Sequence, residues 1–124
     1  MLVKRIFQTA GAWGLIVLTL GYTSFLTGAD PSLLGLARPE FVHGFFLVCL
    51  PWQLVFFVIA SDPPSYRPII AVAILEKLPF AGIVFHLYGT GQVNETMLFL
   101  GLADATFGLL FCWSFFKTGP ANPT

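Results

Sequence analysis

Four apolar segments, each long enough to cross a lipid bilayer as a helix, dominate the sequence. They cover roughly residues 6–26, 41–60, 69–88 and 96–116. A helix needs about 20 residues to cross about 30 Å of hydrocarbon. Segments in lipid must also satisfy their own backbone hydrogen bonds, which favours helices at this length. The sequence therefore predicts an all-α fold in which residues 1–124 form a single transmembrane domain, an integral membrane four-helix bundle.

The composition excludes the common soluble classes. Only 10% of the residues are charged and 56% are hydrophobic, whereas a soluble domain is about 25% charged. The formal net charge is zero, and the sequence has no basic patch of the kind that nucleic-acid binding requires. The two cysteines, Cys49 and Cys112, are too few for a disulfide scaffold. The sequence thus indicates a membrane protein that does not bind nucleic acid.

Basic residues in the connections predict the orientation. Lys4, Arg5, Arg67 and Lys117 fall on one side of the four predicted segments, and Arg38 falls on the other. Lysine and arginine are enriched in short cytoplasmic loops. We therefore expect a multi-pass protein of the bacterial cytoplasmic (inner) membrane with both termini cytoplasmic (N-in, C-in).

The stretch "ILEKLP" places two charged residues inside the third segment. Lys77 lies nine residues after Pro68, and Asp104 lies nine residues after Glu95. At about 1.5 Å per residue, each lies about 13 Å from its own end of an antiparallel pair of helices. The two side chains thus fall at one level, and we predict an intramembrane ion pair between Lys77 and Asp104. Such residues are functional candidates, although a pair that only fixes helix register is also consistent with this pattern.

Glu76 is the remaining acidic group in this region. Its side chain leaves the helix in a different direction from that of Lys77, because the side chains of neighbouring residues point about 100° apart around a helix. We expect Glu76 to have a separate partner or to be a neutral buried acid.

Two histidines form a second candidate group at the non-cytoplasmic end. Glu40 and His43 are three residues apart at the start of the second segment, and His86 lies at about the same level in the third. Two imidazoles and a carboxylate can ligate a metal, and two imidazoles can hold a haem iron. Interfacial histidines that only donate and accept hydrogen bonds fit the same pattern, and no intrinsic cofactor is expected.

Small residues predict where the helices approach closely. Such residues at small-xxx-small spacing let helices pack tightly in lipid. They are Ala10 and Gly14 in the first segment and Gly101, Ala105 and Gly108 in the fourth. The tryptophans and the 14 phenylalanines are expected to face lipid or a neighbouring pigment or quinone.

Three motifs resemble those of a widespread group of small bacterial four-helix membrane proteins. They are the loop "DPPSYRP" (62–68), Lys77 in the third segment and "GLADATFGLLF" (101–111). The resemblance implies the fold and no activity. It draws attention to Asp104 and to the cytoplasmic loop residues Asp62, Tyr66 and Arg67. Glu76 stands where that group has a small residue.

Three functions fit these observations. The first is a structural or accessory subunit of a larger respiratory or photosynthetic membrane complex, in contact with membrane lipids and other membrane subunits. The second is a small membrane enzyme acting on a lipid, isoprenoid or quinone through Lys77, Asp104 and Glu76 or His43. The third is a small transporter or proton-conducting protein that uses Glu76 and Asp104, which four helices without an internal repeat make difficult unless the chain oligomerises. The absence of a catalytic motif favours the accessory subunit.

Overall fold

The chain forms four helices connected in sequence order. The computed structural model describes residues 1–28 and 39–120. Within these ranges there are no strands, and the helices are α1 (Leu2–Leu26), α2 (Pro39–Ser61), α3 (Arg67–Gly89) and α4 (Glu95–Lys117). Each of the four predicted segments lies inside one of these helices, and the predicted all-α, four-helix architecture is confirmed. All four helices are long and apolar enough to cross a membrane.

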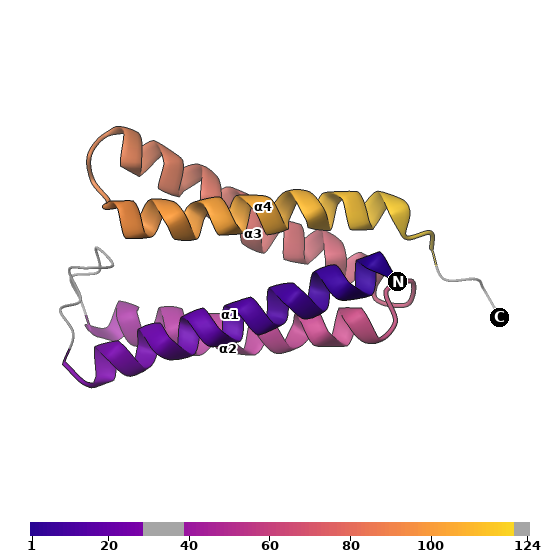
Figure 1. Cartoon of the computed structure of the whole chain (residues 1–124), viewed down its shortest axis with the longest axis horizontal. Helices are drawn as coiled ribbons and strands as arrows, with labels where there is room; N and C mark the ends of the chain where they lie inside the picture. Colours follow the sequence, from indigo (N-terminus) through magenta and orange to yellow (C-terminus); the bar gives the residue numbers. More distant parts are fainter. Residues whose placement is uncertain (29–38, 121–124) are drawn as a thin grey trace.

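The helices are arranged as two antiparallel pairs. α1 packs along α2 and α3 packs along α4, and contacts between the two pairs are sparser. Figure 1 shows the pairs meeting where α1 begins and α4 ends and separating toward the opposite end. We call the first of these the closed end of the bundle and the second the far end. The start of α1 and the end of α4 therefore lie at the same end, as an even number of antiparallel helices requires.

Three phenylalanines hold the closed end together. Phe7 of α1 stacks on Phe111 of α4 with ring centroids 4.4 Å apart, and Phe56 of α2 lies 5.2 Å from Phe111 and 6.3 Å from Phe7. All three rings are fully buried. The surrounding aliphatic core also comes from this end, and it consists of Ile6, Ala10, Ile59, Ala60, Ile70 and Ala73. The expectation that the phenylalanines face lipid is wrong for these three rings, which form the contact between the two pairs.

The turn between α3 and α4 is set by local hydrogen bonds. Gly91 adopts a positive φ of 74°, and the N–H of Gln92 donates to the carbonyl of Leu87 at 2.8 Å. These features end α3 just before Gly91, whose backbone lies in the left-handed region that glycine adopts without steric cost. Asn94 then caps α4 by accepting a hydrogen bond from the N–H of Met97 at 3.0 Å. The turn thus fixes α3 and α4 as antiparallel neighbours.

Small residues lie at the contacts within each pair. A side chain at Gly14 would overlap that of Gln53 in α2, and one at Gly101 would come within 2.6 Å of Val84 in α3. The close approach of the helices therefore depends on glycine at these two positions. Of the five predicted packing residues, Ala105 is half-buried and the others are buried: Ala10, Gly14, Gly101 and Gly108.

Candidate functional site

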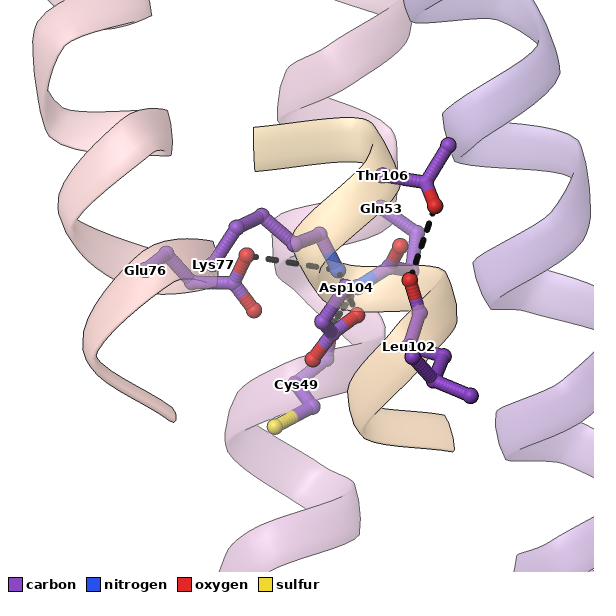
Figure 2. Close-up of polar contacts among 7 residues, drawn as sticks. All are labelled: Cys49, Gln53, Glu76, Lys77, Leu102, Asp104 and Thr106. Atoms are coloured by element: carbon purple, nitrogen blue, oxygen red, sulfur yellow. Dashed lines mark hydrogen bonds and ion pairs between the residues drawn. The ribbon is translucent and has the colours of Figure 1, made fainter. Parts of the chain in front are cut away.

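A buried lysine with two carboxylates lies midway along α3 and α4. The Nζ of Lys77 donates to Oδ1 of Asp104 at 2.9 Å and lies 3.4 Å from Oε2 of Glu76. Figure 2 shows the ammonium group between the two carboxylates. The Lys77 side chain is 7% exposed, and the carboxylate side chains are about a fifth exposed, at 20% and 19%. This contact between Lys77 and Asp104 was predicted from the sequence, because each residue lies the same number of residues from the start of its own segment.

The backbone of α4 brings Asp104 to Lys77. Gly101, Asp104 and Gly108 are spaced at i, i+3 and i+7, which places them on one face of a helix. A side chain at Gly108 would come within 3.3 Å of the Cβ of Lys77. Because Gly108 has no side chain, α3 approaches α4 closely enough for the Lys77 ammonium to reach a short aspartate.

Glu76 shares Lys77 instead of having a separate partner. Its backbone direction differs from that of Lys77, but its longer side chain returns to the ammonium group (Figure 2). The Oε2 atom is buried and has no hydrogen-bond partner in the described part of the chain. The prediction of a separate partner for Glu76 is therefore wrong among the described residues. Glu76 is the more weakly held of the two carboxylates in this site.

α2 contributes the opposite wall of this site. The Lys77 Nζ lies 5.4 Å from the centroid of the Phe56 ring, within the range of a cation–π contact. One turn away, the buried Gln53 donates through Nε2 to the carbonyl of Cys49 at 2.9 Å (Figure 2). Its Oε1 is buried without a hydrogen-bond partner among the described residues. Phe56 was not singled out from the sequence.

The two histidines do not form a common site with Glu40. His43 packs against α1, where its Nδ1 lies 2.7 Å from the Tyr22 hydroxyl and its ring lies edge-on to Phe25. His86 is exposed on α3. The described residues contain no group of three side chains that could hold a metal ion. The prediction of a metal site formed by these three residues is therefore wrong. His43 and His86 lie at the same level along the bundle, but α2 and α3 belong to different pairs, which separate toward this end.

Hydrogen bonds from Arg67 hold the junction between the α2–α3 loop and α3 against the end of α4. Asp62 accepts hydrogen bonds from the Ser65 hydroxyl and, through its carbonyl, from the Tyr66 N–H. Arg67 then donates through Nε to the carbonyls of Phe115 at 3.1 Å and of Thr118 at 2.7 Å. Its guanidinium also lies 3.8 Å from the centroid of the Phe115 ring. A cation here satisfies the unpaired carbonyls at the C-terminus of α4 and complements its dipole.

Substitution of Arg67 tests how much this contact with the end of α4 stabilises the protein. We expect Arg67→Ala to lower the free energy of unfolding by about 1.5–3 kcal/mol, since it removes hydrogen bonds from a charged donor and leaves carbonyls unpaired. Arg67→Lys should recover little, because lysine cannot stack and donate in the same geometry. The measurement is titration with a denaturing detergent in mild-detergent micelles. Arg5→Ala, at an exposed residue of α1, is the matched control, and full stability of Arg67→Lys would contradict the assignment.

Chemically, the site around Lys77 can do two things. It can fix the register of α3 against α4 through an ion pair, and it can supply an acid and a base away from water. Comparison of the chain with protein-family models, curated proteins and solved structures found no match. The function must therefore be inferred from the residues themselves.

Proposed function

We propose that the chain is a small integral membrane protein that crosses the bacterial cytoplasmic membrane four times, with both termini in the cytoplasm. The closed end of the bundle carries Lys4 and Arg5 at the start of α1, Arg67 at the start of α3 and Lys117 at the end of α4. This is the distribution that the positive-inside rule associates with the cytoplasmic face. The same proposal includes membership of the group of small four-helix proteins that the loop and helix motifs resemble.

Within the membrane, the chain acts as a structural or accessory subunit of a larger respiratory or photosynthetic complex. One observation carries this proposal: the charged groups midway along the helices contact each other inside the bundle, whereas large apolar side chains are exposed on all four helices. Examples of exposed residues are Leu20, Leu47, Leu75, Phe99 and Leu109. Surfaces of this kind pack equally well against lipid chains and against transmembrane helices of another subunit.

A small membrane enzyme acting on a lipid, isoprenoid or quinone is the second candidate. The observation in its favour is the excess carboxylate beside Lys77, because an ion pair that only fixes helix register needs Asp104 and not Glu76. In such an enzyme, Glu76 and Lys77 would exchange protons with a substrate held between the helix pairs.

Co-migration from native membranes separates these two functions. The chain is extracted in a mild detergent, resolved on a native gel and identified together with its companions by mass spectrometry. An accessory subunit will migrate with a large complex in a fixed ratio, and membranes from cells lacking the chain provide the control. A free monomer or a small homo-oligomer carrying a bound lipid or quinone would contradict the subunit proposal and favour the enzyme.

A further inference from the structure

The site around Lys77 contains one more carboxylate than it has cations. Lys77 supplies one positive charge, and Glu76 and Asp104 supply two groups that are negative when ionised. The other basic residues of the described helices are near helix ends: Lys4, Arg5, Arg67 and Lys117. The site would therefore carry a net negative charge away from water if both carboxylates were ionised, and an unpaired charge in such surroundings is costly.

The two carboxylates differ in how Lys77 holds them. Asp104 accepts a hydrogen bond from Nζ at 2.9 Å, whereas Oε2 of Glu76 lies 3.4 Å away and has no hydrogen bond among the described residues. An ionised carboxylate needs such bonds more than a neutral carboxyl group does. Of the two, Glu76 is accordingly the group whose neutral form the site accommodates more easily.

We propose that this site binds one proton, carried by Glu76, while Lys77 and Asp104 form the ion pair. Among the described residues, Lys77 beside it on α3, Asp104 on α4 and Cys49 on α2 lie close enough to Glu76 to interact with its charge. The bound proton balances the charge of the cluster and makes Glu76 a group that takes up and releases a proton inside the bundle. This inference holds whether the chain is a subunit or acts alone, so that its failure would leave the proposed function standing.

Reaction with dicyclohexylcarbodiimide tests the protonation state directly. The reagent dissolves in lipid and reacts with a protonated carboxyl group: the acid proton moves to a nitrogen of the reagent, the carboxylate oxygen bonds to its central carbon, and rearrangement leaves a stable acylurea with no leaving group. The Glu76 side chain is about a fifth exposed, at 20%, which leaves part of it accessible to a small reagent. We expect peptide mass spectrometry of the full chain in liposomes to find the adduct on Glu76, with labelling lost as the pH rises and the proton is released.

Variants of the cluster make the test specific. Glu76→Gln should show no adduct at position 76. In Asp104→Asn, Glu76 becomes the carboxylate that pairs with Lys77, and its labelling at neutral pH should fall at least several-fold. In Lys77→Gln, both carboxylates lose their cation, and Asp104 should become labelled as well. Cys49→Ser is the matched control, since it changes a neighbouring titratable group without altering the charge balance, and Glu76 labelling should persist.

Several outcomes would overturn the proposal. One is labelling of Asp104 in place of Glu76 in the unaltered chain, and another is no adduct on Glu76 at any pH while the protein remains folded by its melting curve. Equal labelling of Glu76 in the unaltered chain and in Asp104→Asn would show that the pair does not control the proton. Protection of Glu76 by sodium ions at constant pH would replace the proton with a metal cation.

Discussion

Replacing Lys77 with methionine is expected to produce the largest loss of stability in this protein. The change leaves Asp104 and Glu76 without the ammonium group that both contact. Removing one partner of a buried ion pair costs about 3–5 kcal/mol, because the remaining charge is left uncompensated. Binding of a proton by Asp104 relieves part of that cost, and we therefore expect the lower end, about 3 kcal/mol. Asp104→Leu should cost less, since Glu76 remains to pair with Lys77.

Double variants separate the energy of the interaction between Lys77 and Asp104 from the effect of replacing each residue alone. Lys77→Met combined with Asp104→Leu removes both members of the pair, and it should be more stable than Lys77→Met alone. Exchanging the charges, with Lys77→Asp and Asp104→Lys, should likewise preserve expression better than either single change does. Titration with a denaturing detergent measures the free energies, and a double-mutant cycle gives the coupling. Simple additivity of the two single losses would contradict a direct interaction between Lys77 and Asp104.

Replacing Gly108 with leucine is expected to produce the second largest loss. A Cβ atom at this position would overlap Cδ2 of Leu78 and would lie 2.8 Å from its Cγ and 3.3 Å from Cβ of Lys77. The Leu78 side chain can move, but the backbone of Lys77 cannot do so without separating α3 from α4. Overpacking of this kind costs about 1–3 kcal/mol.

A second glycine of this helix pair provides the control for Gly108. Gly82 lies in α3 with open space around its missing side chain. Gly82→Leu should leave the free energy of unfolding unchanged or raise it by up to about 1 kcal/mol, since leucine has the higher helix propensity. Detergent titration of both variants makes the comparison. Equal losses at the two positions would show that α3 and α4 do not pack through Gly108.

The helices and the ion pair were predictable because both follow from distances along the chain. α2, α3 and α4 each begin close to a proline or a capping residue, and residues at equal distances from opposite ends of an antiparallel pair must lie at one level. This is why Lys77 and Asp104 could be matched from the sequence. His43 and His86 also lie at one level but do not share a site, because a level along the bundle axis does not show which helix a side chain faces.

The core was less predictable, for a related reason. In a soluble helix, the apolar face marks the buried side, but a helix that is apolar all round gives no such signal. Phe7 and Phe111 are buried at the closed end while Phe99 and Phe116 are exposed, and nothing in their local sequence separates them. Gly11, whose missing side chain admits Phe57 and the backbone of Gln53, was overlooked for the same reason.

The ion pair between Lys77 of α3 and Asp104 of α4 organises the polar interior of the bundle. Solid-state NMR in lipid bilayers measures this contact directly, as the dipolar coupling between ¹⁵N at Nζ of lysine and ¹³C at Cγ of aspartate. Lys4→Arg and Lys117→Arg leave Lys77 as the only lysine, and Asp104→Asn is the control. We expect strong coupling, since Nζ and Oδ1 are 2.9 Å apart, and its loss in the control. No coupling in the folded protein would contradict the account.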